Sequence, residues 1–471
     1  MLKPLVNNVN KIMKETKEKY YKALAEKIGG RQGERIAEAI KDMYTLYKPE
    51  MIEWFAGLYD LKAGGYYYSN GARDNEKIGY QGKCYDLRPD SESTEQALRF
   101  ISTSGLLGDR TLKEKLPAWM QEQIVRYIKG LQDPNGFFYN PQWPKELTDS
   151  KLSRRARDLG WCVTILEALG SAPTYDTPTG IKGDGLDADG NPVKISVVSS
   201  VSEREEKPKS SVAIPKELEN KESFLAYLSS LDIKHESYSV GNTLTAITGQ
   251  IIYRDKELES QGADYSLCKI IIDWLNENQN SENGLWHDTA DYYGVNGLMK
   301  TSGVYGKIGV LMPHADKAVK SAIDAISTDQ TPGAVTDIYN TWFAVTRIKR
   351  HLRTHGGDEG QRMADKIVAD LREMAPEAIR ITKEKLSVFA KPYGSFSYTP
   401  MASAGRSQGM PVTFRGAYEG DVNATVICSS DILGYMYSAL ELSDVRIPIY
   451  YPEDFERYIE ILEKNRAKLL G

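Results

Sequence analysis

The stretch 117–143, PAWMQEQIVRYIKGLQDPNGFFYNPQW, together with 152–170, LSRRARDLGWCVTILEALG, contains the unit that decides the fold. The first stretch begins as a helix with one charged and one apolar face. It then runs into a Gly-aromatic turn, GFFY, and a polar loop. The second stretch is a more apolar helix that is rich in small residues, which suits a helix touched on most sides. The unit therefore predicts a hairpin of one outer and one inner helix.

Related units recur along the chain, and six hairpins can be assembled from them. Stacked hairpins each bury the apolar face of a neighbour, and a closed ring leaves no exposed end. We therefore predict an all-α fold, an (α/α)6 toroid or barrel of six helical hairpins with a small β-containing insertion. An open helical array or a pair of bundles is the alternative. The remaining outer and inner pairs are 51–69 with 92–102, 221–231 with 240–255, 264–288 with 295–311, 314–327 with 335–352, and 363–398 with 420–442.

One segment interrupts the pattern within a single expected domain, residues 1–471. Residues 172–220 combine Gly, Asp and Pro turns with one β-like run and a charged tail, which predicts a surface insertion with a β-hairpin. Its stretch DGLDADGN, 184–191, resembles a calcium loop but lacks the glutamate that closes an EF-hand. No metal is expected there.

Composition and net charge limit the classes of partner that we expect for the protein. Hydrophobic residues make up 41% and charged residues 27%, and the net charge is −5 without a basic stripe, so we expect no nucleic-acid partner. No apolar run reaches the roughly 18 residues of a membrane span, and residues 1–30 lack the apolar core of a secretory signal. A cytoplasmic protein without membrane contact, cofactor or metal is expected. The four scattered cysteines predict free thiols, and the oligomeric state stays open.

Three of the turns and one helix start resemble a known superfamily. QDPNGFFY (132–139), NQNSENGLW (278–286) and KPYGSFSY (391–398) resemble the Gln-x-x-x-Gly-aromatic turns of terpenoid cyclase and protein prenyltransferase toroids. EGDVNATVICSSD (419–431) is similar to the Glu-x-Asp-Val-Arg helix start of prenyltransferase β subunits. The resemblance implies the α/α-toroid superfamily, which also includes many glycoside hydrolases and polysaccharide lyases. The chain lacks an Asp-x-Asp-Asp motif and a recognisable zinc set around Asp421, which argues against cyclase or prenyl-transfer chemistry.

In such a ring the loops entering the inner helices open on one rim, so the polar residues at those helix starts are the site candidates. Capping of the helix N-termini is the alternative role for each Asp and Asn. The expected catalytic residues are His287, Tyr293, Asp421, Asp337 and Asp158. The expected substrate-binding residues are Arg73, Arg154, Arg157, Asn242, Trp286, Tyr292, Asn296, Asn340 and Asn423.

Two chemistries fit these candidates. NGLWHDTADYYGVNG (283–297) resembles the Gly-x-x-x-His…Tyr-x-Gly segment of toroid lyases acting on hyaluronan and chondroitin, which implies His287 as base-side partner and Tyr293 as acid in β-elimination. Hydrolysis would instead need two carboxylates, for which the candidates are Asp158, Asp291, Asp337, Glu419 and Asp421.

We therefore expect an enzyme that cleaves an oligosaccharide substrate in a central cavity. The arginines expected at the rim favour a substrate that contains uronates. A terpenoid cyclase or prenyltransferase-like enzyme and a non-catalytic ligand-binding toroid remain alternatives.

Overall fold

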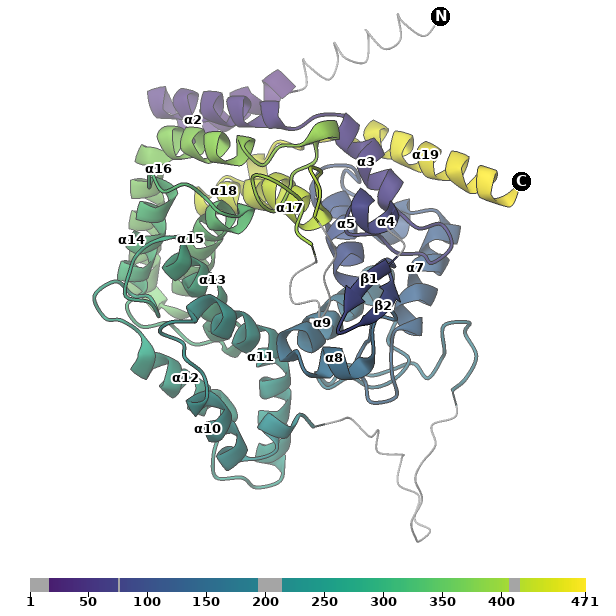
Figure 1. The fold of residues 1–471 in the computed structure, drawn as a ribbon. Helices are drawn as coiled ribbons and strands as arrows, with labels where there is room; N and C mark the ends of the chain where they lie inside the picture. The colour runs from purple at the N-terminus through teal and green to yellow at the C-terminus, as the bar shows by residue number, and fades with distance from the viewer. Residues whose placement is uncertain (1–16, 75–76, 194–213, 406–415) are drawn as a thin grey trace, which may run out of the picture.

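The computed structural model describes residues 17–74, 77–193, 214–405 and 416–471. Within them the chain is predominantly α-helical, which confirms the predicted all-α class. The helices follow one another around a common centre (Figure 1). No helix in these four ranges has the length and apolar character needed to cross a membrane.

Six helical segments correspond to the predicted inner helices, and each overlaps its predicted range. The last of them passes through a π-helical turn, labelled η4, between α17 and α18. The segments are α5 (Ser91–Thr103), α9 (Leu152–Ala168), α11 (Ser237–Ser260), α13 (Tyr292–Ile308), α15 (Val335–His355) and the continuous run α17 (Val422–Val426), η4 (Ile427–Asp431) and α18 (Ile432–Ala439).

Six further helices match the predicted outer members. The remaining helices precede, follow or connect the paired helices along the chain. The outer helices are α3 (Glu50–Leu58), α7 (Ala118–Gly130), α10 (Lys221–Ser229), α12 (Leu267–Asn278), α14 (Ala315–Ile326) and α16 (Gly357–Ser387). The others are α2 (Gly30–Met43), α4 (Asn70–Asp74), α6 (Leu112–Lys115), α8 (Lys145–Asp149), α19 (Pro452–Leu470) and the short helices η1 (Tyr44–Leu46), η2 (Lys216–Leu218), η3 (Pro392–Gly394) and η5 (Ser443–Val445).

Contacts between the inner helices form a closed cycle. Helix α5 contacts α9, α9 contacts α11, α11 contacts α13, α13 contacts α15, α15 contacts α18, and α17 returns to α5. The outer helices lie against this cycle: α7 packs on α9, α12 on α11, α14 on α15 and α16 on α15. Helix α2 in turn covers α16, and α19 covers α3.

Small residues allow the inner helices to approach closely. In α13 almost every residue from Gly294 to Tyr305 is buried. A methyl group added at Gly297 would lie 2.3 Å from Ser237 Oγ of α11, so only glycine fits this crossing. The outer helix α14 buries only one face, which is made of alanines, Val319 and Ile326 together with Ser321. This division is the one expected from the repeat.

Three of the Gly-aromatic turns are closed by the same kind of β-bridge. Gln132 and Phe138 form an isolated β-bridge around Gly136, whose φ is 86°. The Gln132 amide also donates to the Tyr175 carbonyl at 2.9 Å, which fixes the turn to the following segment. Equivalent bridges join Tyr59 to Tyr66 and Ala390 to Phe396.

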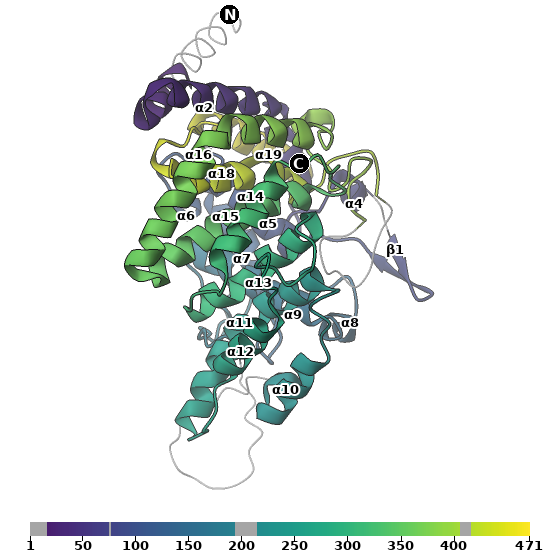
Figure 2. The ribbon, with the colours of Figure 1, turned by 90° about the vertical axis from the view of Figure 1, so that its left-hand side faces the viewer.

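The structure contains a β-hairpin where none was predicted. Strands β1 (Lys77–Tyr80) and β2 (Lys83–Asp86) pair antiparallel, with Lys77 opposite Asp86. Figure 2 shows β1 projecting beyond the helices on the side where α4 and α8 lie. This short hairpin lacks the alternating apolar pattern that sequence reasoning depends on.

The predicted insertion 172–220 is described only in part. The β-like run from 195 to 202 lies outside the described residues, while residues 172–193 form turns with one bridge, Leu186 to Pro192. The Lys129 ammonium of α7 pairs with Asp184 at 2.7 Å and fixes this segment to the helices. In the described ranges no group of three His, Cys, Asp or Glu side chains is placed to hold a metal ion.

We expect Gly136→Ala to destabilise the protein by about 1–3 kcal/mol, because a side chain at this positive φ is strained. Its Cβ would also lie 2.4 Å from the Asp176 carbonyl oxygen. The matched control is Gly130→Ala at the end of α7, where the added Cβ meets open space. Urea unfolding measures both, and equal effects of the two substitutions would contradict the role given to the turn.

Candidate functional site

Hydrogen bonds link the starts of the inner helices to one another. The Tyr293 hydroxyl at the start of α13 donates to the His235 carbonyl before α11, and Asn296 of α13 donates to Asp337 of α15, both at 2.9 Å. Val335 N, at the start of α15, donates to the Tyr398 carbonyl in the turn before α17. The starts of these three neighbouring helices therefore lie at the same end of the structure.

The same linkage continues through the remaining hairpins. Val422 N of α17 donates to the Tyr68 carbonyl in the turn before α5, and Ser91 N of α5 donates to Asn140 Oδ1 in the loop before α9. Asn140 also donates to Asp158 of α9 at 3.3 Å. A band of polar residues thus runs along the helix starts.

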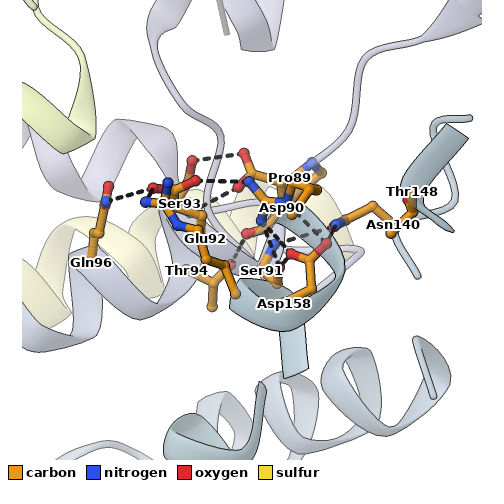
Figure 3. Close-up of polar contacts among 12 residues, drawn as sticks. Pro89, Asp90, Ser91, Glu92, Ser93, Thr94, Gln96, Asn140, Thr148 and Asp158 are labelled. Atoms are coloured by element: carbon orange, nitrogen blue, oxygen red, sulfur yellow. Dashed lines mark hydrogen bonds and ion pairs between the residues drawn. The ribbon is translucent and has the colours of Figure 1, made fainter. Parts of the chain in front are cut away.

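The most deeply buried part of this band is centred on Arg154. Its side chain is 0% exposed, and its guanidinium pairs with Glu92 of α5 at 2.7 Å and with Asp158 one turn further along α9. The Ser91 hydroxyl donates to Oδ1 of Asp158, the oxygen that Arg154 Nη2 also contacts (Figure 3). Arg154 is therefore neutralised by two carboxylates that share its burial.

Glu92 connects three helices. Besides Arg154 it accepts hydrogen bonds from Arg157 at 2.8 Å and from Gln96 at 3.1 Å. Gln96 in turn donates to Asn423 of α17 at 3.0 Å. The structure thus brings the predicted residues Arg154, Arg157, Asp158 and Asn423 into one network.

A second group of predicted residues also lies together. Asn340 donates to Asn296, and Asn296 donates to Asp337, each at 2.9 Å. The other oxygen of Asp337 accepts the backbone N–H groups of Gly333 and Ala334. Asp337 therefore caps the start of α15 and orients the two amides.

Asp421 forms the N-cap of α17. One carboxylate oxygen accepts Ala424 N at 2.8 Å and the other accepts Tyr398 N at 2.8 Å and Ala404 N at 3.2 Å. Burial raises the pKa of Asp421 to about 6, although these backbone N–H groups and the Tyr68 hydroxyl favour the ionised form. The capping alternative therefore describes the contacts of Asp421 well.

Three amide groups of the band have polar atoms without a partner among the described residues. They are Gln96 Oε1, Asn340 Oδ1 and Asn423 Nδ2, and all three side chains are at least 96% buried. Leaving such atoms without a hydrogen bond costs about 1–3 kcal/mol each. They are places where a ligand or water can add a hydrogen bond.

A second carboxylate pair lies further along the inner helices. Arg99 of α5 donates to Glu95 at 3.1 Å and to Asp431 of η4. Burial raises the pKa of Glu95, partly offset by Arg99, while the charge of Asp431 raises it further. Glu95 and Arg99 line a cavity of about 180 Å³ between α5 and α9.

The π-helical turn places Asp431 in this pair. Five residues, Ile427–Asp431, adopt the π conformation in the middle of an otherwise α-helical segment. Such single turns shift the following side chains around the helix axis and are frequent at functional sites. The sequence offers no signal for this shift, which explains why Asp431 was missed.

Aromatic rings adjoin the same region. The Tyr435 and Phe343 rings stack with centroids 4.1 Å apart, and Tyr339 contacts both rings. Residues 339, 343 and 347 lie one turn apart on α15, so this row could have been found from its i, i+4 spacing. All three rings retain partial exposure.

His287 and Tyr293 lie together at the start of α13, but without a hydrogen bond between them. Their rings meet edge to face with centroids 5.1 Å apart. The Tyr293 hydroxyl donates to a backbone carbonyl, and His287 Nδ1 lies 3.0 Å from Thr289 Oγ1. The nearby Asp291 caps α13 through Gly294 N. The neighbouring Tyr292 points elsewhere, because its hydroxyl lies 2.5 Å from Lys385 Nζ of α16.

Three further predicted residues lie apart from these networks. Trp286 is 1% exposed and donates to the Leu275 carbonyl, so its ring is part of the core and offers no face to a sugar. Arg73 pairs with the adjacent Asp74 and with the Gly57 carbonyl. Asn242 is half-buried on α11, one turn beyond Tyr238.

Comparisons with known proteins give no assignment: no family model, curated protein or solved structure matches this chain.

We expect Arg154→Ala to lower the free energy of unfolding by about 3–5 kcal/mol, because Glu92 and Asp158 would remain buried without their counterion. The control is Arg126→Ala, which removes an ion pair with Asp189 whose two side chains are 65% and 68% exposed. Its effect should stay below about 1 kcal/mol. Similar losses in urea unfolding for both variants would contradict the importance given to the buried network.

The second expectation concerns Asp90, whose side chain caps α5 through Ser93. Burial raises the pKa of Asp90 to about 6, so the stability that its protonated form contributes is full below about pH 4 and is lost as the pH rises through 6. Asparagine caps equally well and does not titrate. Asp90→Asn should therefore gain stability relative to the parent between pH 4 and 7.

The expected gain in the free energy of unfolding of Asp90→Asn is about 3 kcal/mol, because the pKa of Asp90 is raised from 3.8 to about 6. Unfolding measured at several pH values tests it, with the exposed Asp109→Asn as control. A parent–variant difference that does not change with pH would contradict the burial of an ionisable group at this helix start.

Proposed function

We propose that the chain is an (α/α)6 toroid and that its inner helices form the active site of an enzyme that cleaves glycosidic bonds. The closed cycle of contacts among the inner helices supports the first half of the proposal. The second half depends on one observation: Glu95 and Asp431, two nearly buried carboxylates on different helices, are both bonded to Arg99 beside a cavity.

This pair has the chemistry that hydrolysis needs. One carboxyl group must carry a proton for the leaving oxygen, and the other must be ionised to activate water or attack the sugar. Burial raises the pKa of Glu95, which favours its protonated form and suits it to the acid role. Asp431, bonded to the Arg99 guanidinium, is then the base or nucleophile.

The surroundings of the pair also suit a sugar. Tyr339 and Tyr435 provide partly exposed rings against which the apolar face of a pyranose can pack. The unpartnered amide atoms of Asn340 and Asn423 can bind hydroxyl groups. Elimination through His287 and Tyr293 remains the alternative route, although these two side chains bond to their own loop and to the segment before α11.

A terpenoid or prenyl enzyme is the second candidate, because aromatic rings lie on several inner helices and can stabilise a carbocation. Three of these rings are already covered by cations of the chain. Arg157 lies 4.5 Å from the Trp161 centroid, Arg347 4.2 Å from that of Phe343, and Lys300 5.5 Å from that of Tyr238. A bound carbocation would meet these positive charges, so the rings favour a glycan instead.

We expect Glu95→Gln to lower kcat on a cleaved oligosaccharide by about 10²–10⁴-fold, because glutamine cannot donate the proton. Its amide oxygen can still accept a hydrogen bond from Arg99, so the fold should be retained. His287→Ala is the matched variant for the alternative route and should keep at least half of the activity.

Release of reducing ends from a panel of neutral and acidic oligosaccharides measures turnover, and ultraviolet absorbance of an unsaturated product reports elimination. Full activity of Glu95→Gln, or activity that depends on His287 with an absorbing product, would reject the assignment of the carboxylate pair. Absence of cleavage across the panel, with binding retained, would favour a non-catalytic glycan-binding toroid.

A further inference from the structure

The arginines that the sequence placed at the rim are largely neutralised. Arg154 pairs with Glu92 and Asp158, Arg155 with Asp149 and Glu217, and Arg73 with Asp74. Arg157 shares Glu92 with Arg154. These side chains therefore do not supply the positive charge that an acidic substrate would need.

Three other cations lie on the neighbouring inner helices α13 and α15 without an ion pair among the described residues. They are Lys300, Lys307 and Arg347. Arg347 donates to the Met299 carbonyl of α13, Lys307 donates to the Thr245 carbonyl of α11, and Lys300 lies over the Tyr238 ring. Each contacts a neutral group, so none of the three charges is compensated.

Arg347 approaches α13 between the two lysines, since its Nη1 would lie 2.6 Å from a Cβ added at Gly303. Burial, together with the charges of Arg157 and Arg347, lowers the pKa of Lys300 to about 7, and the Glu92 carboxylate opposes this shift. Lys307 is exposed to solvent at the end of α13, but the protein around its ammonium and the charge of Arg347 lower its pKa to about 8. Arg347 therefore lies within electrostatic range of both lysines.

Among the described residues, the charged and titratable groups that face Arg347 include no carboxylate. Arg347 also faces Arg350 and the hydroxyl groups of Tyr339 and Tyr435, while His351 is held neutral because burial and Arg347 lower its pKa to about 4. Thr301 Oγ1, next to Lys300, and His351 Nδ1 are buried without a partner in the described ranges. Repelling charges and unmet hydrogen bonds occur together, which is the arrangement that an anionic ligand relieves.

We propose that Lys300, Lys307 and Arg347 form an anion-binding site that takes the carboxylates of an acidic oligosaccharide. Lys300 and Lys307 are seven residues apart on α13, so they lie on one face of the helix and are separated by about 10 Å along it. The site therefore accepts two carboxylates of one oligosaccharide, one at each lysine, with Arg347 between the two lysines. This inference depends on the proposed glycan function for its ligand class, but not on the identity of the catalytic residues.

Calorimetric binding of trigalacturonate to the full chain, with maltotriose as the neutral probe, tests the site. Glu95→Gln protein serves as background, so that turnover does not interfere. Lys300→Gln and Arg347→Gln should each weaken trigalacturonate binding about ten- to a hundredfold, because each removes a charge-assisted contact. Lys300→Arg, which keeps the charge, should retain most of the affinity.

The matched control is Lys320→Gln, an exposed lysine of α14 that pairs with Asp324, and it should leave binding unchanged. Equal affinity for trigalacturonate and maltotriose, or equal losses in Lys320→Gln and Lys300→Gln, would overturn the anion site. The Tm of each ligand-free variant is a second readout. It should not fall, because each substitution removes an uncompensated charge, and a marked fall would show a structural role instead.

The two proposals fail separately. Charge-dependent binding without cleavage by the parent protein would leave the anion site standing and reject the cleavage. Cleavage of neutral oligosaccharides with no binding of trigalacturonate would reject the anion site and leave the carboxylate pair in place.

Discussion

The fully buried guanidinium of Arg154 is the interaction on which the arrangement of the inner helices depends most. It joins Glu92 of α5 to Asp158 of α9. Glu92 also accepts hydrogen bonds from Arg157 and Gln96, and Gln96 donates in turn to Asn423 of α17. A charge inside a helical core is costly unless it is paired and hydrogen-bonded. This requirement fixes how the first, second and last inner helices face one another, and so fixes the polar band along their starts.

The hairpin pattern could be read from the sequence because it depends on local rules. Gly136 adopts the positive φ that its turn requires. Gly241 of α11 and Gly297 of α13 allow these two helices to approach closely, and the helices themselves follow from spacing and composition. The β-hairpin at 77–86 and the π-helical turn at Ile427–Asp431 depend on tertiary context and leave no such pattern. The predicted helices are present, whereas these two irregular elements were missed.

The candidate site was predictable in its location more than in its chemistry. Asp337 and Asp421 lie at helix starts as expected, and their oxygens cap those starts. The arginines were expected to contact substrate, but a sequence cannot show that carboxylates of neighbouring helices already neutralise them. The cations without an ion pair in the described ranges, Lys300, Lys307 and Arg347, lie beyond the helix starts, and the sequence does not show that carboxylates are missing beside them.

A crystal structure of Glu95→Gln protein with bound trigalacturonate tests the central claim most directly, namely that the polar faces of the inner helices meet around one ligand. The account predicts density for the sugar within the ring of inner helices, with carboxylates against Arg347 and Lys300 and a glycosidic oxygen near residue 95. Density confined to an outer surface, such as the groove between α14 and α16, or no bound sugar at saturating concentration, would contradict it.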